Sequence, residues 1–303
     1  MTATSETVER TSESPHFRAR ERFRDVYAHR EILANLIRKE LKVKYAASVL
    51  GAVWSILNPL VYLAVFTFVA KVLGAGIPDF PVYLLSGLLA WNLFSASLSS
   101  GASSVLDNAN LVKKVAFPRE ILPLSTVGVA LVDFVLQSVV LFAFIVISGY
   151  GFHWPELALW PLAALTLVVL TLALSLWVAA VNVRYRDVGH LLNIALIVWF
   201  WATPIVYAEY QVQRLAQGGT GTFLGIDRFA LYLLNPLTDI VAGFHRALYG
   251  VVIPEGSTTP VLFEQSLAWV AGVLAITLVV ALVVLRFTWA SFFVRSGDFA
   301  EEL

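Results

Sequence analysis

Basic residues are distributed unevenly around six long apolar segments, and this distribution constrains the fold more than any other feature. When successive connections are assigned to alternate sides of a membrane, one side holds all of the 21 Lys and Arg residues except Lys71, Arg214, Arg228 and Arg246. An apolar stretch of about 20 residues spans a bilayer as a helix, and the side rich in Lys and Arg stays cytoplasmic. The sequence therefore predicts an all-α membrane protein with six transmembrane helices and both termini in the cytoplasm. The expected spans are residues 49–72, 80–106, 121–147, 157–181, 191–207 and 267–285.

The composition supports a membrane protein and excludes several classes of site. The chain is 58% hydrophobic and only 14% charged, whereas a soluble domain carries about 25% charged residues. A net charge of zero gives no reason to expect binding to nucleic acid. The lack of cysteine excludes disulfides, thiolate metal sites and a cysteine nucleophile. The histidines His153, His190 and His245 do not have the spacing of metal ligands, so we expect them at surfaces or interfaces.

The chain divides into three parts. Residues 1–22 are mainly polar and lack the apolar core of a signal peptide, so we expect a disordered cytoplasmic tail. Residues 23–46 form an amphipathic helix that is too polar to span the membrane and should lie in its cytoplasmic interface. On that helix Arg38, Lys39 and Lys42 lie opposite the apolar side and should face lipid headgroups. Residues 47–303 form the transmembrane domain.

Glu40 interrupts the apolar side of this interfacial helix. One interpretation is an ion pair with Lys44 at position i+4, which is the favourable order of charges along a helix. The other is that Glu40 faces another protein subunit. Asp133, near the middle of the third span, also has two interpretations. It is either uncharged and hydrogen-bonded to a neighbouring helix or directed into a pore.

Four stretches of sequence resemble one family of membrane proteins. They are RKELKVKY at residues 38–45, LVKKVAFPREILP at 111–123, NVRYRD at 182–187 followed by TPIVY at 203–207, and LNPLT at 234–238. In this order they resemble the permeases of ABC-2 type transporters, in the branch that exports O-antigen, teichoic acid and other cell-wall glycans. The similarity covers nearly the whole chain from about Phe23.

The resemblance implies a transport subunit rather than an enzyme. Such permeases work as a homodimer with two copies of an ABC ATPase, which binds the ATP and Mg²⁺, and the permease itself needs no cofactor. The sequence agrees, because it contains no G-x-x-x-x-G-K-[ST] phosphate loop. The implied cargo is a lipid-linked polysaccharide, and the implied location is the cytoplasmic (inner) membrane of a bacterium.

The resemblance also suggests which residues couple the permease to its ATPase. The cytoplasmic loops combine charge with apolar residues, as expected for a short helix that docks into a groove on a partner. The alternative is that their basic residues only fix the topology. The proposed coupling residues are Lys113, Lys114, Phe117, Pro118, Arg119, Glu120, Arg184, Arg186, Asp187 and Glu40.

Aromatic residues suggest a path for the cargo. Sugar rings have apolar C–H faces that stack on aromatic side chains, and a hydrophobic constriction can close a channel to water and ions. On the first and fifth spans we expect Tyr62, Phe66, Trp199 and Trp201 to form the gate, where the Pro residues of 58–59 and 203–204 bend the helices. The segment 223–249 is too polar to span and should form two short re-entrant helices around Asn235 and Pro236, which we include in the pore.

Three other functions compete with polysaccharide export. A drug or lipid exporter of the same superfamily would share the topology. A membrane glycosyltransferase would need clustered acids, but Asp107, Glu120 and Asp187 are isolated and no D-x-D motif occurs. A secondary transporter would need inverted repeats and paired intramembrane charges, and neither is visible in the sequence.

Overall fold

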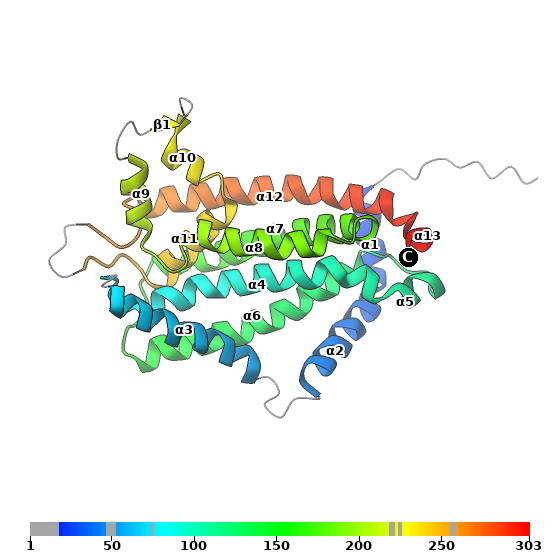
Figure 1. Cartoon of the computed structure of the whole chain (residues 1–303), viewed down its shortest axis with the longest axis horizontal. Coiled ribbons are helices and arrows are strands. Elements are labelled where there is room, and N and C mark those ends of the chain that lie inside the picture. Colours follow the sequence, from blue (N-terminus) through cyan, green and yellow to red (C-terminus); the bar gives the residue numbers. More distant parts are fainter. Residues whose placement is uncertain (1–17, 47–52, 74–75, 218–221, 224–225, 255–258) are drawn as a thin grey trace, which may run out of the picture.

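The protein is an elongated bundle of helices, and Figure 1 shows the computed structural model. The structure describes residues 18–46, 53–73, 76–217, 222–223, 226–254 and 259–303. Among these residues, four helices are long and apolar enough to cross a membrane. They are α4 (Phe80–Asp107), α6 (Ile121–Ile147), α7 (Leu159–Arg184, preceded by the 3-10 turn η1, Glu156–Ala158) and α12 (Leu267–Ser296). The prediction of an all-α membrane protein is confirmed at this level, and the one short hairpin of the described chain joins β1 (Thr222–Phe223) to β2 (Ile226–Asp227).

Two further apolar helices are shorter. Helix α3 (Val53–Leu73) contains the apolar stretch Leu60–Val69, and α8 (Val188–Ala202) is 15 residues long. The predicted fifth span, residues 191–207, is wrong at its end because α8 stops at Ala202. Thr203 has extended backbone angles (φ −110°, ψ 137°), as expected for a residue that precedes a proline. The Thr203-Pro204 pair therefore ends the helix and does not bend it.

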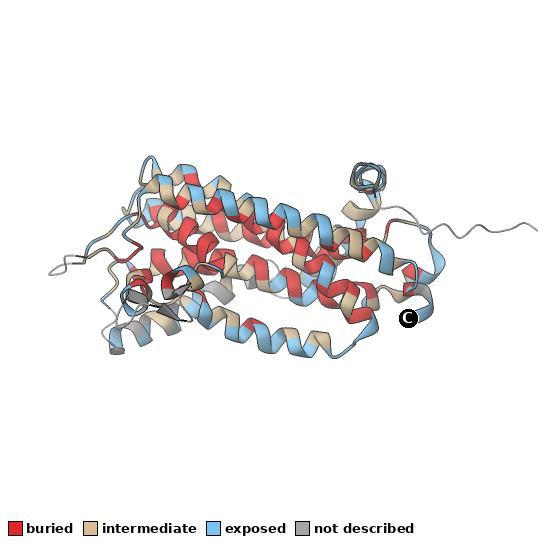
Figure 2. Cartoon of the chain, turned by 90° about the horizontal axis from the view of Figure 1, so that it is seen from above, coloured by how far each residue is buried: buried red, intermediate tan, exposed pale blue. Residues whose placement is uncertain are grey.

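Small residues hold the central helices together. Helices α4 and α7 pack so closely that a Cβ atom added to Gly101 would lie 2.1 Å from Oγ of Ser175. Close approach at small residues is a common basis for helix packing in membranes. The Asn182 side chain of α7 also donates a hydrogen bond of 2.8 Å to the carbonyl oxygen of Ala102 on α4. Buried residues accordingly follow the contacts between helices, and exposed residues follow the outer faces of the bundle (Figure 2).

The two ends of the bundle differ in what they carry. Helices α1 (Ala19–Ala28), α5 (Ala109–Lys114) and α13 (Phe299–Glu302) lie at one end, which we call the basic end. Helices α9 (Glu209–Gln217) and α10 (Arg228–Tyr232) lie at the opposite end (Figure 1). Helix α11 (Pro236–Leu248) enters the bundle from that opposite end and packs against α4, α7 and α12.

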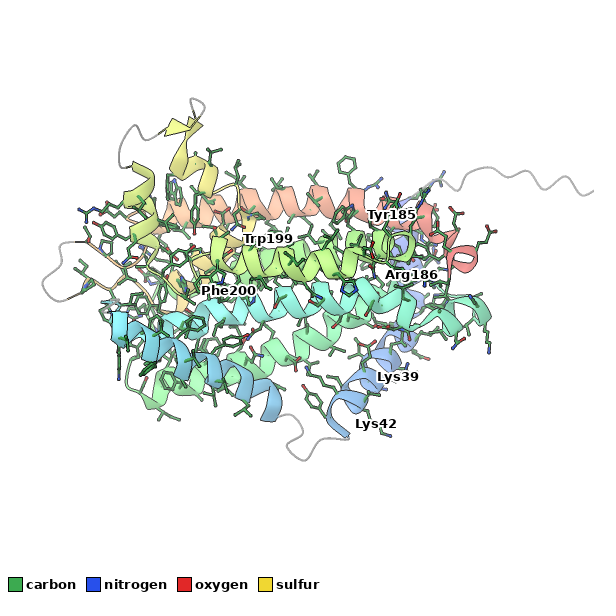
Figure 3. All side chains as sticks on the ribbon, in the orientation of Figure 1. Lys39, Lys42, Tyr185, Arg186, Trp199 and Phe200 are labelled. Atoms are coloured by element: carbon green, nitrogen blue, oxygen red, sulfur yellow. The ribbon has the colours of Figure 1, made fainter. Side chains whose placement is uncertain are left out.

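The N-terminal region forms two helices and not the single helix predicted over residues 23–46. Helix α1 begins at Ala19, within the range assigned to the tail, and α2 (Arg30–Ala46) follows after a break at His29. The apolar side of α2 packs on α6, where Ile37 lies against Gly128. Arg38, Lys39 and Lys42 are all exposed, and Figure 3 labels the two lysines on α2.

Candidate coupling surface and translocation path

Five of the predicted coupling residues are exposed charged side chains at the basic end, on α5 and on the turn between α7 and α8. Lys113 and Lys114 occupy the last turn of α5 and are exposed. Arg184, Arg186 and Asp187 are exposed at the turn, and Figure 3 labels Arg186 there. These side chains can reach a partner without any rearrangement of the fold.

The other loop residues predicted to contact the ATPase are turned into the protein. Phe117 is half-buried and packs on a cluster that includes Val112 of α5 and Phe299 of α13. Pro118 is buried and Arg119 is half-buried. The structure thus separates the predicted coupling residues into an exposed set and a set that connects the loop to the bundle.

Glu120 belongs to the internal set. Its side chain is completely buried, and both carboxylate oxygens accept hydrogen bonds from Nη2 of Arg22, at 2.9 and 3.0 Å. Nε of Arg22 donates another of 3.2 Å, and the indole nitrogen of Trp289 donates a fourth hydrogen bond of 3.3 Å. Glu120 therefore joins α1 and α12 to the start of α6. Arg22 and Trp289 had no recognisable role in the sequence, because they lie 98 and 169 residues away from Glu120 along the chain.

The predicted ion pair between Glu40 and Lys44 is wrong. The Lys44 amine instead lies 2.5 Å from Oδ2 of Asp133 on α6. Glu40 is half-buried against the same helix, where its carboxylate accepts a hydrogen bond of 3.4 Å from Oγ of Ser125. Burial raises the pKa of Glu40 above its ordinary value, since removal from water disfavours the charged form.

Asp133 has a charged partner that the sequence did not reveal. Besides Lys44, it accepts a hydrogen bond of 2.5 Å from the hydroxyl group of Tyr45. The predicted bond to a neighbouring helix is present, since both partners belong to α2. Asp133 also lines a polar cavity of about 350 Å³ between α2, α3, α4 and α6.

The aromatic residues predicted to form a gate lie together. Tyr62 stacks on Phe66 at 6.1 Å between ring centres, and Phe66 contacts Trp201 at 6.5 Å. Phe200, which was left out of the predicted gate, connects Phe66 to α4 through Trp91 at 6.3 and 5.3 Å. Figure 3 labels Trp199 and Phe200 on α8. We call these residues the aromatic cluster, which comprises Tyr62, Phe66, Trp91, Phe94, Trp199, Phe200 and Trp201.

Asn235 joins this cluster to the segment before the last span. Its side-chain oxygen accepts a hydrogen bond of 2.8 Å from the indole nitrogen of Trp199 and one of 3.1 Å from the backbone nitrogen of Leu237. Asn235 is therefore the N-cap of α11, and Pro236 occupies the first helical position, where proline is favoured. Together with α8, α9 and α10 these residues form an open groove of about 1020 Å³. We call it the outer groove, and it is lined mainly by apolar side chains, including Trp199, Trp201, Tyr207, Tyr232, Leu234, Asn235 and Pro236.

A buried hydrogen bond between a histidine and a carboxyl group at the same end of the bundle was missed. His245 is completely buried on α11, and its Nδ1 atom lies 2.8 Å from Oε1 of Glu209 on α9. The imidazole ring stacks on Tyr83 of α4 at 3.9 Å. The expectation that His245 lies at a surface or interface is wrong, because its contacts with α4 and α9 join segments far apart in the sequence.

Comparison with known proteins decides the family. Residues 31–217 match the ABC-2 type transporter family, which is more than half of the chain. The chain belongs to this family. The resemblance inferred from the sequence is therefore confirmed.

Several individual members of the ABC-2 transporter family are similar to the chain. The O-antigen export system permease protein RfbA of Myxococcus xanthus is 34% identical over 257 residues, which cover 82% of this chain and 93% of that protein. A protein of the same name from Klebsiella pneumoniae is 34% identical over 183 residues, or 59% of this chain and 70% of that protein. The polysialic acid transport protein KpsM of Escherichia coli is 23% identical over 232 residues, or 73% of this chain and 82% of that protein.

Membership of this family gives the chain a partner. The chain is a multi-pass membrane protein and a transport subunit rather than an enzyme, and an ABC ATPase in a separate subunit supplies the energy.

Proposed function

We propose that the chain is the permease of an ATP-driven exporter that moves a lipid-linked polysaccharide from the cytoplasm across the inner membrane. The printed names of the relatives, O-antigen export permease and polysialic acid transport protein, support a polysaccharide as cargo. The structural observation that carries the proposal is the continuity of the aromatic cluster with the outer groove through Trp199 and Trp201.

This continuity gives a polymer a suitable surface to move along. Aromatic rings offer apolar faces to the C–H groups of sugars without fixing one orientation, because each contact depends on area rather than on directed hydrogen bonds. Phe66, Phe200 and Trp201 lie within 6.5 Å of one another, measured between ring centres. They constitute a hydrophobic constriction of the kind that closes a channel at rest. Tyr62, Trp199, Asn235 and Pro236 extend the path on either side.

The topology that we propose has six crossings. Helices α3 and α8 supply the two crossings beyond the four long helices, while α10 and α11 form a re-entrant pair that begins and ends at the outer face. Both described ends of the chain lie at the basic end, which faces the cytoplasm in this proposal. Arg38, Lys39 and Lys42 then face the headgroups of the inner leaflet.

The proposed assembly contains two copies of the chain and two ATPase subunits, with ATP and Mg²⁺ bound by the ATPase. Lys113, Lys114, Arg184, Arg186 and Asp187 supply the contact surface. The movement of the ATPase is transmitted inward by Phe117, Pro118, Arg119, Glu120 and Glu40. Glu120 is hydrogen-bonded to residues of α1 and α12, and Glu40 is hydrogen-bonded to a residue of α6.

Deletion of the chain from its host tests the proposal. We expect polysaccharide to disappear from the cell surface and lipid-linked polymer to accumulate inside, and a plasmid copy to restore export. A glycosyltransferase would leave no polymer at all in the deletion strain, and a drug exporter would change drug efflux without changing the surface glycan. Either result would overturn the proposal.

A further inference from the structure

The cavity beside Asp133 has an unusual lining for the interior of a membrane protein. It is a partly open cavity of about 350 Å³ among α3, α4, α6 and the end of α2, and we call it the polar pocket. Its polar lining consists of Lys44, Asn92, Ser95, Ser99, Asp133 and Gln137. Charged and amide side chains are costly at membrane depth, and where they occur they commonly mark the path of a substrate.

The charges of the polar pocket balance each other. Lys44 and Asp133 form an ion pair across its wall, with 2.5 Å between the amine and a carboxylate oxygen. The Lys44 charge is thus already opposed by a carboxylate of the same chain. A phosphate group placed here would meet an acid as well as a base, so the pocket does not favour an anion. The balance of charge favours a neutral ligand.

The remaining polar groups suit hydroxyl groups. Asn92 donates a hydrogen bond of 3.0 Å to Oε1 of Gln137, which holds the two amides side by side on α4 and α6. Each amide has two donor hydrogens and two acceptor lone pairs, so a bonded pair can both donate to and accept from a ligand that does the same. Ser95 and Ser99 add hydroxyl groups about one and two helical turns beyond Asn92 along α4.

Two aromatic side chains complete the lining and connect the pocket to the gate. Tyr62 and Trp91 line the polar pocket and also belong to the aromatic cluster. Helix α4 runs from the outer end of the bundle at Phe80 to the basic end at Asp107. Ser95 and Ser99 therefore lie closer to the basic end than Trp91 does. The pocket comes before the aromatic cluster for a cargo that arrives from the basic end.

We propose that the polar pocket binds a neutral, hydroxyl-rich sugar unit of the cargo. Asn92, Gln137 and Asp133 bond its hydroxyl groups, and Tyr62 and Trp91 stack on its C–H faces. Lys44 and Tyr45 hold the carboxyl group of Asp133 in place. This inference rests on the proposed function, because it names the part of the cargo that the path recognises.

Site-specific photo-crosslinking tests the proposal with the native glycan. Since the chain contains no cysteine, a benzophenone maleimide attaches only where a cysteine is introduced. Ser99→Cys places the probe in the polar pocket. Ser100→Cys is the matched control, because Ser100 is also exposed on α4 but does not line the pocket. Membranes that contain the whole transporter are irradiated, and the purified chain is tested for attached carbohydrate by periodate oxidation and for lipid phosphate by mass spectrometry.

We expect carbohydrate on the Ser99→Cys chain and much less on the Ser100→Cys chain. Combining Ser99→Cys with Asn92→Leu and Gln137→Met should lower the capture about fivefold or more, since hydrogen bonds are lost without a large change in volume. Equal capture at both positions, capture undiminished by the double substitution, or capture of lipid phosphate without sugar would each overturn the proposal. Surface glycan on cells with the unmodified chain is scored separately, so a failed pocket is distinguished from a failed export function.

Discussion

Glu120 shows how one residue can connect the loop at the basic end to the whole bundle. Its carboxyl group is removed from water and is hydrogen-bonded to the Arg22 guanidinium and the Trp289 indole. A buried charge of this kind is costly without its partners, so the three side chains depend on one another. Any movement of the loop by the ATPase would therefore shift α1 and α12 as well.

Replacing Glu120 with glutamine should destabilise the protein. The substitution keeps the volume but leaves the Arg22 guanidinium without its counter-charge. Removal of one partner from a buried ion pair costs about 3–5 kcal/mol. The Arg22 side chain keeps 20% exposure, so we expect a loss of unfolding free energy near the lower end of that range. A thermal unfolding scan of the purified protein in detergent would measure it as a lower melting temperature.

The matched control is Glu21→Gln. Glu21 pairs with Arg18 at 3.0 Å, but both side chains are largely exposed. An exposed pair contributes about 0–1 kcal/mol, so this variant should have the same melting temperature as the unmodified protein. Equal melting temperatures for Glu120→Gln and the unmodified protein would mean that Glu120 does not hold these elements together.

At the scale of elements, α11 is a short helix surrounded by long ones. It begins at Pro236 behind the Asn235 cap and carries buried residues along almost its whole length. Gly243 lets it approach α7 and α12, because a Cβ atom there would lie 2.7 Å from Leu274 and 3.2 Å from Ala163. The position of α11, and with it the bond between Asn235 and Trp199, depends on this close fit.

Gly243→Val should therefore loosen α11. Overpacking a tightly packed interior costs about 1–3 kcal/mol, so we expect a lower melting temperature and reduced export. Gly272→Val on α12 is the control, since nothing lies within 4 Å of a Cβ atom at Gly272. Both variants place the same side chain in a helix, and only the first should harm the protein. If the two variants had the same melting temperature, α11 would be less tightly packed than the structure indicates.

The sequence predicted elements better than it predicted their contacts. Hydropathy and charge located the four long helices, because each depends on its own composition. The end of α8 was missed even though Pro204 marks it, since the apolar run continues past the proline. The partners of Glu120, Asp133 and His245 are 36 to 169 residues distant in the chain. Such pairs come from the packing of helices, which periodicity along one helix does not encode.

The aromatic path was predicted in part for the same reason. Tyr62, Phe66, Trp199, Trp201 and Asn235 were selected because of their residue type and position, and the structure brings them close to one another. Trp91 and Phe94 on α4 were missed. Nothing in the sequence distinguishes these two rings from the other aromatic residues of the apolar helices, and only the packing of α4 against α8 makes them part of the cluster.

At the scale of the whole molecule, the bundle has two chemically different ends. The described N-terminal helix, α5 and α13 share the end that carries most of the basic loops, while α9, α10 and the hairpin lie at the other. Charge that remains on the cytoplasmic side orients a membrane protein during insertion. In the topology that we propose, this charge places the basic end in the cytoplasm.

Cysteine labelling should establish this orientation. In the cysteine-free chain, Asn110→Cys, Gly189→Cys and Ser296→Cys should be protected from an impermeant maleimide in intact cells and react after permeabilisation. Gly151→Cys, between α6 and η1, should react in intact cells. Two further outer positions, Gly219 and Ser257, lie outside the described residues and provide an additional test. The opposite pattern would invert the proposed topology.

Closure of the path at rest belongs to the assembled transporter. An aromatic constriction excludes ions because water leaves a narrow apolar passage. We expect alanine at Phe66, Trp199 and Trp201 to increase ion flux through the resting transporter in liposomes and to weaken export. Trp199→Ala should have the larger effect of the two Trp variants, because it also removes the hydrogen bond that ties α8 to Asn235. A liposome flux assay with a pH- or potassium-sensitive dye would report the leak.

Trp177→Ala is the control that distinguishes loss of the gate from the loss of any large aromatic side chain. Trp177 lies on α7 with 47% of its surface exposed, and it does not belong to the aromatic cluster. Its removal takes away a comparable side chain without opening the path, so liposomes with this variant should stay ion-tight. If Phe66, Trp199 and Trp201 could all be replaced with no leak and no loss of export, the constriction would have to lie elsewhere. The outer groove around Pro236 would then be the next place to examine, since Trp199 and Trp201 also line it.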